Sequence, residues 1–336
     1  VVAPLAAALG VKMAKMSGRG LGHTGGTIDK LESIDGFNVT LDTDSFFKQV
    51  NEIGISIIGQ TGNLAPADKK IYALRDVTAT VGNISLIASS IMSKKIAAGA
   101  QNIVLDVKCG SGAFMKDEES ATKLAETMVD IGKKCGRNIA AVITNMDIPL
   151  GSNVGNALEI KEVIDILNNK GDEQLRELCL VLSATILSIS YDWDYEDAYK
   201  KAEQTIVDGS AYKKFIELVN AQGGNTDFTI LPVAKTSLEV KATQDGYIQS
   251  IDSRIVGESA VLLGAGREKK SDTIDYGAGI VLYKKTCDKI SIGDTIAILY
   301  AETDEKLKNA ENLFNTSYVI GDVKPEIKPL IFKTIR

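Results

Sequence analysis

The segment between Met16 and Thr27 has the composition of a loop that binds an anion. It places five glycines among the nine residues from Gly18 to Gly26, and Ser17 and Thr27 frame them. Backbone N–H groups with so little side-chain bulk around them can converge on a phosphate. A short helix predicted over residues 28–32 would point its N-terminus at the same anion. These residues therefore indicate phosphate chemistry.

Other interpretations of this loop start from similar patterns. The P-loop needs a Gly-Lys-Ser/Thr sequence, which this segment lacks. Residues 20–25 match the G-x-G-x-x-G pattern of dinucleotide-binding folds, and Asp42 supplies the acid that follows in such folds, but Gly36 interrupts the crossover helix that they require. A glycine-rich turn without any ligand also stays open on the pattern alone.

A second set of residues combines a planar cation, a point charge and a hydroxyl. Ser90 and Lys94 are four residues apart on one predicted helix and therefore share a face. Arg75 lies on the preceding predicted helix and would converge with them if the two helices pack antiparallel. Together they could bind the carbonyl groups and ring edge of a ligand. On the pattern alone, Lys94 beside Lys95 and Arg75 next to an aspartate are more typical of a solvated surface.

Several long motifs resemble those of the pyrimidine nucleoside phosphorylases, the family of thymidine phosphorylase. They occur in the same order and cover essentially the whole chain. The resemblance implies reversible phosphorolysis of uridine, thymidine or deoxyuridine to the free base and (deoxy)ribose 1-phosphate. The motifs are SGRGLGHTGGTIDKLES at 17–33, YALRDVTATV at 72–81, IASSIMSKK at 87–95, DVKCGSGAFM at 106–115 and GNALE at 155–159.

The resemblance implies a role for each candidate residue. It places Arg75, Ser90 and Lys94 on the pyrimidine, where they would neutralise the charge that develops on the departing base and so act as the catalytic set. It places the hydroxyls of Ser17 and Thr27 on the phosphate. Taken alone, a serine or threonine beside glycines is more often a turn or cap residue.

The upstream part of the family pattern is missing from this sequence. His23 is the only histidine, and we expect it to be structural, because the histidine implied to assist catalysis belongs to a Lys-His-Ser-x-Gly-Gly motif that does not occur here. The chain begins at Val1 in the middle of a helical pattern, so we expect a fragment with little or no phosphorolysis. Without their partner helices, Ile84, Ile87 and Ile91 would be exposed, and the family's homodimer would be impaired.

The resemblance also implies a monovalent cation, potassium, and no organic cofactor. Leu150 and Asn153 fall at positions of backbone ligands, and Glu162 falls at the position of the carboxylate ligand. An exposed helix carboxylate is an equally good interpretation of Glu162. Residues 108–112 follow a predicted strand and look like a hinge, although an ordinary turn fits them as well.

Composition excludes several classes of function. The chain has 336 residues, of which 44% are hydrophobic, and a net charge of −6 without a basic block, which disfavours nucleic acid as a partner. The four cysteines show no C-x-x-C spacing, which favours reduced thiols in a cytoplasmic protein. No apolar run reaches the roughly 18 residues that a membrane helix needs. We expect a cytoplasmic enzyme whose partners are a pyrimidine nucleoside and inorganic phosphate.

The order of predicted elements indicates an α/β protein with an appended unit. Strands at 102–107 and 139–144 alternate with helices, which predicts a mixed sheet with flanking helices; the resemblance implies the nucleoside phosphorylase/phosphoribosyltransferase type. From residue 238 the pattern becomes β-rich, like a barrel-sandwich α+β unit. We assign residues 1–66 and 98–234 to an α/β phosphate-binding domain, 67–97 to the remnant of a small helical domain that carries the pyrimidine-binding helices, and 235–336 to a C-terminal α+β domain.

Two other functions stay open at this stage. An enzyme like anthranilate phosphoribosyltransferase would share the fold, but it would need paired acids for diphosphate and magnesium and would lack the set Arg75, Ser90 and Lys94. A module that binds pyrimidines without turning them over is the alternative that is not an enzyme. Binding of uracil without turnover would identify such a module.

Overall fold

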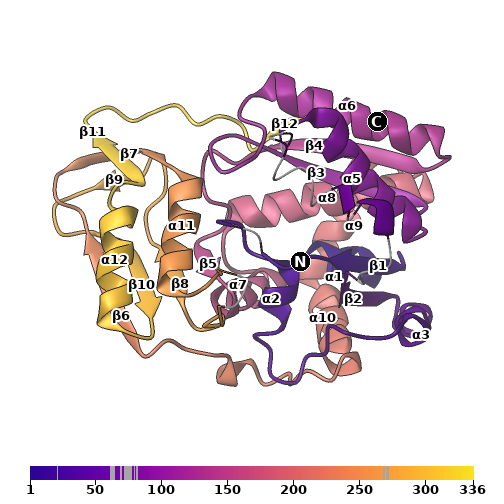
Figure 1. Ribbon diagram of the computed structural model, residues 1–336, viewed down its shortest axis with the longest axis horizontal. Helices are drawn as coiled ribbons and strands as arrows, with labels where there is room; N and C mark the ends of the chain where they lie inside the picture. Colours follow the sequence, from indigo (N-terminus) through magenta and orange to yellow (C-terminus); the bar gives the residue numbers. More distant parts are fainter. Residues whose placement is uncertain are drawn as a thin grey trace.

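The computed structural model describes residues 1–20, 22–60, 65–68, 70–71, 78, 80, 82–267, 269 and 272–336. Figure 1 shows a larger α/β unit, which contains both chain ends, beside a smaller β-rich unit built mainly from residues 236–321. The predicted fold class, mixed sheets with flanking helices followed by an α+β unit, is confirmed.

A parallel pair of strands leads into the glycine loop. β1 (Met13–Ser17) pairs with β2 (Ile55–Gly59), and the connection between them contains α3 (Thr43–Ile53). The Asp42 side chain caps α3 by accepting a backbone N–H of its first turn at 2.9 Å. The acid that the dinucleotide interpretation requires is therefore a helix cap. β1 ends at Ser17, so the loop starts directly at the end of the strand.

A mixed sheet forms the centre of the α/β unit. β3 (Asn102–Cys109) and β4 (Asn138–Asn145) are parallel, and β12 (Ile331–Ile335) is antiparallel to β4. Alternate strand residues join two different hydrophobic clusters, which places α6 (Glu118–Lys134) and α8 (Glu173–Tyr191) on opposite faces. β12 comes from the segment assigned to the C-terminal domain, so the end of the chain returns to the α/β sheet.

The other helices of the α/β unit pack around the strand pair β1–β2 and share one hydrophobic core with it. Their amphipathic faces bury mostly alanine, leucine and isoleucine, and the short α1 is enclosed by α8, α9 and α10. The elements are α1 (Val2–Ala8), α7 (Ala157–Leu167), α9 (Tyr195–Val207), α10 (Ser210–Ala221) and the 3₁₀ turn η1 (Phe228–Ile230).

The helix that carries the predicted base-binding residues packs on the α/β unit. α5 (Ile84–Ala97) begins at the capping side chain of Asn83 and lies against α6. We expected Ile84, Ile87 and Ile91 to be exposed. That expectation is wrong, because all three are partly buried against the core formed by α6 and β3.

The C-terminal unit consists of two sheets and two helices around its own hydrophobic core. One sheet has the strand order β5-β8-β10-β6 and the other the order β11-β7-β9. The elements are β5 (Asn153–Gly155), β6 (Thr236–Lys241), β7 (Gly246–Ile251), α11 (Ser253–Leu263), β8 (Gly279–Leu282), β9 (Lys289–Ile290), β10 (Thr295–Ala301), α12 (Asp304–Phe314) and β11 (Tyr318–Gly321).

β5 ties the two units together. By sequence it belongs to the α/β unit, yet it forms the edge strand beside β8. The crossing point consists of glycines: Gly279 has a φ of 152°, and a Cβ atom there would overlap the carbonyl oxygen of Val154. Helix α7 follows β5 at once, so the position of α7 is fixed relative to the C-terminal sheet.

Candidate active site

The glycine loop runs from Ser17 at the end of β1 to the start of α2 (Thr27–Leu31) and folds back on itself. A Cβ atom on Gly26 would overlap the backbone nitrogen of Gly20, and a Cβ atom on Gly20 would lie 2.7 Å from the carbonyl oxygen of Thr24. Side chains at these two positions would therefore push the loop apart. Ser17 and Thr27, the predicted phosphate ligands, are half-buried at its two ends.

A buried carboxylate holds the folded loop. Asp29 is only 2% exposed, and its Oδ2 accepts the Gly20 N–H at 2.7 Å. Its Oδ1 lies 2.9 Å from Nη1 of Arg19 and 3.1 Å from Nη1 of Arg267. Glu32 accepts two hydrogen bonds from Arg19, and the hydrogen bonds to Glu32 and Asp29 raise the pKa of Arg19. The loop is thus fixed to α2 and to the C-terminal unit.

His23 contacts backbone atoms of the surrounding loops. Its Nε2 lies 3.4 Å from the carbonyl oxygen of Gly112, which accepts a hydrogen bond in the tautomer that carries the proton on Nε2. The backbone of His23 also packs so closely on α11 that a Cβ atom on Gly257 would overlap its carbonyl oxygen. His23 therefore joins the glycine loop to the loop after β3 and to the C-terminal unit.

The predicted hinge segment, residues 108–112, is held by Asp147. Gly110 has a φ of 128°, a conformation that favours glycine. The Asp147 carboxylate accepts the Ser111 N–H at 2.9 Å and pairs with Lys328 at 2.8 Å. Burial acts to raise the pKa of Asp147, but the hydrogen bonds from Lys328 and Ser111 outweigh it and lower the pKa.

The structure brings two of the three predicted base-binding residues into contact. Ser90 is 5% exposed, and its Oγ accepts a hydrogen bond from Nζ of Lys94 at 3.3 Å. Lys94 also pairs with the buried carboxylate of Asp68 at 3.0 Å. The sharing of one face by Ser90 and Lys94, which their spacing predicted, is confirmed. Arg75 lies outside the described residues.

Basic side chains connect α5 to the strand that carries the glycine loop. Burial and the charge of Lys94 lower the pKa of Lys95 on α5. Burial and then the charges of Lys95 and Lys30 lower the pKa of Lys15 on β1. Ammonium groups influence one another in this way only over short distances. The lysines of α5 and of β1 are therefore close enough for their charges to influence one another.

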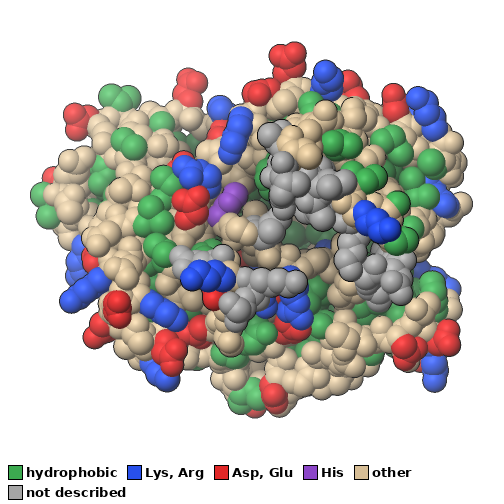
Figure 2. Space-filling view, viewed as in Figure 1, with side chains coloured by type: hydrophobic (Ala, Val, Ile, Leu, Met, Phe, Trp, Pro, Cys, Tyr) green, Lys and Arg blue, Asp and Glu red, His purple; other side chains and the backbone are tan. Residues whose placement is uncertain are grey.

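The surface is hollowed on this side of the molecule. Figure 2 shows the hollow between the C-terminal unit and the α/β unit, with lysine and arginine side chains around it and aspartate and glutamate side chains among them. Basic side chains in a hollow attract anions, although Lys94 and Lys30 already pair with Asp68 and Glu159 here.

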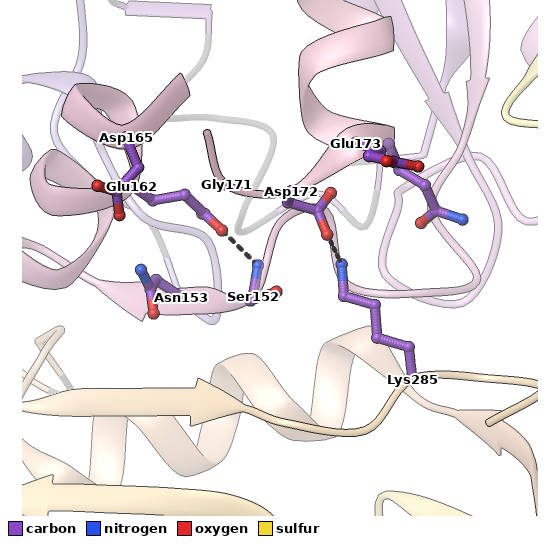
Figure 3. A pocket seen from close by; sticks show the side chains of 9 residues that line it. Ser152, Asn153, Glu162, Asp165, Gly171, Asp172, Glu173 and Lys285 are labelled. Carbon is purple, nitrogen blue, oxygen red and sulfur yellow. Dashed lines mark hydrogen bonds and ion pairs between the residues drawn. The ribbon is translucent and has the colours of Figure 1, made fainter. Parts of the chain in front are cut away.

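Two of the three predicted cation ligands, Asn153 and Glu162, line a second cavity, of about 430 Å³. Figure 3 shows the Glu162 side chain pointing to the backbone of Ser152, whose N–H it accepts at 2.6 Å, with Asn153 beside them. Leu150 precedes Gly151, and the backbone of Gly151 packs against the Glu162 carboxylate. The three predicted positions thus lie on two adjacent segments of chain.

Glu162 is a buried carboxylate. It is 4% exposed, so the interpretation as an exposed helix carboxylate is wrong. Burial raises its pKa to about 7, against the hydrogen bond from the Ser152 N–H. Within the described ranges no lysine or arginine pairs with it, and no three His, Cys, Asp or Glu side chains converge as a side-chain metal site would require. A cation held by this carboxylate and by backbone carbonyl oxygens fits these residues.

Sequence reasoning missed the network around Asp29. Asp29 lies within the recognised motif, but its partner Arg267 is 238 positions away and belongs to another unit. No local pattern marks Arg267. Tyr276, whose hydroxyl donates to Glu32 at 3.3 Å, gave no signal either.

Comparison with known proteins agrees with this geometry. Residues 1–212 match the model of the glycosyl transferase family, a/b domain, and residues 247–321 match the pyrimidine nucleoside phosphorylase C-terminal domain. The first match defines the class, a glycosyl transferase. The second decides against an enzyme like anthranilate phosphoribosyltransferase. The chain belongs to the pyrimidine nucleoside phosphorylase family.

Relatives with this printed function are similar over most of the chain. The pyrimidine-nucleoside phosphorylase of Geobacillus stearothermophilus is 51% identical over 322 residues, which are 93% of this chain and 74% of the relative. That of Bacillus subtilis (strain 168) is 52% identical over 329 residues, 96% of this chain and 76% of the relative. In the part of the chain that the structure describes, no helix is long and apolar enough to cross a membrane.

Proposed function

We propose that the protein catalyses the phosphorolysis of pyrimidine nucleosides, with uridine, thymidine and deoxyuridine as substrates. One observation carries the proposal: β1 leads directly into the glycine loop, and on α5 the Lys94 ammonium is held by Ser90 and Asp68, next to Lys95, whose charge acts on Lys15 of β1. Relatives that are 51–52% identical and named pyrimidine-nucleoside phosphorylase support it.

Phosphate binds at the glycine loop in this mechanism. The hydroxyls of Ser17 and Thr27 donate to its oxygens, together with backbone N–H groups of the loop. The basic side chains of the hollow attract the anion and hold it beside the sugar. A phosphate oxygen then forms the new bond to the anomeric carbon, and the pentose 1-phosphate results. Positioning supplies most of the effect, because the two reactants no longer have to meet by diffusion.

The base departs on the opposite side of the sugar. When the glycosidic C–N bond breaks, its electron pair moves onto the pyrimidine and spreads to the carbonyl oxygens. Lys94 and Arg75 donate to these oxygens, and Ser90 contacts the ring edge. Donors that are already in place stabilise this charge more than water does, because they need no reorganisation. Asp68 and Ser90 hold the Lys94 ammonium at 3.0 Å and 3.3 Å.

We further propose that Leu150 and Asn153, through backbone carbonyl oxygens, and Glu162, through its carboxylate, hold a potassium ion. The support is a buried carboxylate with a raised pKa beside two backbone segments. The ion would neutralise Glu162 and stabilise the segment that precedes β5. The reaction uses no organic cofactor in this proposal. A cytoplasmic location and the homodimer implied by the family resemblance are part of it, and sedimentation velocity would test the dimer.

The proposal is tested by measuring release of uracil from uridine and of thymine from thymidine, with and without phosphate. We expect release that depends on phosphate. The Geobacillus stearothermophilus relative, assayed beside this chain, serves as the reference rate. No release from either nucleoside, with uracil still bound, would replace the enzyme by a pyrimidine-binding module.

A further inference from the structure

The C-terminal unit reaches into the glycine loop through one arginine. Arg267 follows α11, and its guanidinium lies 3.1 Å from Oδ1 of Asp29 on α2. α2 lies at the border between the two units (Figure 1). The contact therefore joins the C-terminal unit to the segment that binds phosphate in the proposed function.

Asp29 transmits this contact to the backbone of the loop. Oδ1 faces Arg267 and Arg19, while Oδ2 accepts the Gly20 N–H at 2.7 Å. The carboxylate is almost completely buried, so its orientation is set by these partners and not by water. A change at Oδ1 turns the carboxylate and moves Oδ2, and Gly20 moves with it.

The loop has little freedom to absorb such a movement. Gly20 and Gly26 pack backbone to backbone, without room for a methyl group between them. Gly26 is also the residue that precedes the first turn of α2, and Thr27 follows it. A displacement of Gly20 is therefore passed on to Thr27, one of the two proposed phosphate ligands.

The two arginines on Asp29 differ in their surroundings. The Arg19 side chain is 47% exposed and also binds Glu32, whereas the Arg267 side chain is 25% exposed. Water screens Arg19 more strongly, so Arg267 has the greater influence on the buried carboxylate. A second contact runs in parallel, from the Tyr276 hydroxyl to Glu32 at 3.3 Å.

We propose that Arg267 is a positioning residue for phosphate, which acts from the C-terminal unit through Asp29 on the shape of the glycine loop. It touches neither phosphate nor nucleoside. The inference rests on the proposed function, because it assumes that this loop is where phosphate binds. It gives the C-terminal unit a part in substrate binding.

Calorimetric titration of the full chain with inorganic phosphate tests this inference without turnover. We expect R267Q to raise the Kd for phosphate about tenfold, the effect of one lost hydrogen bond between charged groups. The Kd for uracil should change less than about twofold, because α5 is not part of the network. R267K, which keeps the charge but loses the planar fork, should restore part of the affinity. If Arg267 only stabilised the fold, R267Q would raise the Kd for phosphate and the Kd for uracil together.

Two further variants keep the test decisive. R254Q is the matched control, since Arg254 is an exposed arginine of the same unit that pairs with Glu258 within α11; it should leave both Kd values unchanged. Y276F removes one hydroxyl from the parallel contact between the C-terminal unit and Glu32. It should raise the Kd for phosphate about threefold.

The outcomes separate this inference from the proposed function. Unchanged phosphate affinity in R267Q, or in R267K where R267Q is unfolded, would overturn the role of Arg267 and leave the proposed function intact. A chain without substitutions that binds no phosphate would overturn both. A parallel loss of phosphate and uracil binding in R267Q would also overturn the positioning role, because it would indicate general loosening of the fold.

Discussion

Lys94 is oriented by protein groups even without a ligand. Its ammonium bridges the Ser90 hydroxyl and the buried Asp68 carboxylate. A long lysine side chain loses rotamer freedom when it binds a base, and these contacts remove part of that freedom beforehand. The spacing of Ser90 and Lys94 in the sequence predicted their shared face. It could not predict Asp68, whose role depends on packing between helices.

Replacing Lys94 should damage catalysis far more than phosphate binding. We expect K94Q to lower kcat/KM for uridine by about 10²–10³, the typical cost of one lost donor to a developing negative charge. The KM for phosphate should change less than about twofold. Steady-state kinetics with each substrate varied in turn would measure both values. K48Q, a substitution of an exposed lysine on α3, is the control. An equal loss in K48Q, or an unchanged kcat/KM in K94Q, would refute the role of Lys94.

The proposed role of Glu162 predicts that the stability of the fold depends on pH and on potassium. Its pKa is about 7 in the folded protein and 4.5 when unperturbed, so the folded state binds the extra proton between these values. Stability that is present below pH 4.5 is therefore lost as the pH rises through about 7. The difference corresponds to about 3 kcal/mol. A cation on the ionised carboxylate would offset this loss.

Thermal unfolding between pH 5 and pH 8 should reveal this dependence. In tetramethylammonium chloride we expect the Tm to fall with rising pH, and in potassium chloride to fall less. E162Q should remove the part of the fall in Tm with pH that is due to Glu162, and it should also remove the effect of potassium on the Tm. E196Q, at an exposed position of α9, should behave like the unsubstituted chain. A potassium effect that survives in E162Q would exclude Glu162 as a ligand.

At the scale of elements, the glycine loop depends on the strand before it and the helix after it. The sequence itself predicts strands over residues 13–16 and 55–58 and a helix over 44–53, close to the observed β1, β2 and α3, because apolar runs and helical periodicity specify these elements locally. The same holds for the alternation of β3, α6, β4 and α7. The fold of the loop itself was not predictable, because the contact between Gly20 and Gly26 is set by Asp29 and its partners.

Two glycine-to-alanine substitutions test whether the close packing at Gly26, rather than the loss of any one glycine of the loop, affects the KM for phosphate. G26A should raise the KM for phosphate about tenfold or more, because a Cβ atom there overlaps the Gly20 nitrogen and moves the donors. G18A is the matched variant: its Cβ atom meets no other atom within 4 Å, so the KM should change less than about twofold. Steady-state kinetics at varied phosphate would compare them. Equal effects of the two substitutions would contradict the described fold of the loop.

At the scale of the whole molecule, segments distant in sequence join the two units. β5 gives the C-terminal sheet its edge strand, β12 returns from the C-terminal segment to β4, and Arg267 binds Asp29. The sequence could not reveal these connections. β5 is only three residues long, β12 carries no local sign of its partner, and the ion pair spans 238 positions. Segments on each side of the predicted domain boundary after residue 234 therefore pair with strands of the other unit: β5 with β8, and β12 with β4.

Breaking the β5–β8 crossing should loosen both units together. In G279A the new methyl group would overlap the Val154 carbonyl at a φ of 152°, so we expect the free energy of unfolding to fall by about 2–3 kcal/mol. Urea unfolding followed by circular dichroism would measure it. G82A, at a position with no atom within 4 Å, should change it by less than about 0.5 kcal/mol. Equal stability of the two variants would argue against a tight crossing.

The central claim is that this chain transfers a pentose from a pyrimidine to phosphate. Phosphorus NMR of a mixture of uridine, inorganic phosphate and the protein tests it most directly. We predict a new phosphate monoester resonance, pentose 1-phosphate, that grows in equal amount with free uracil. Uracil without the monoester would identify a hydrolase, and the absence of both products would contradict catalysis by this chain.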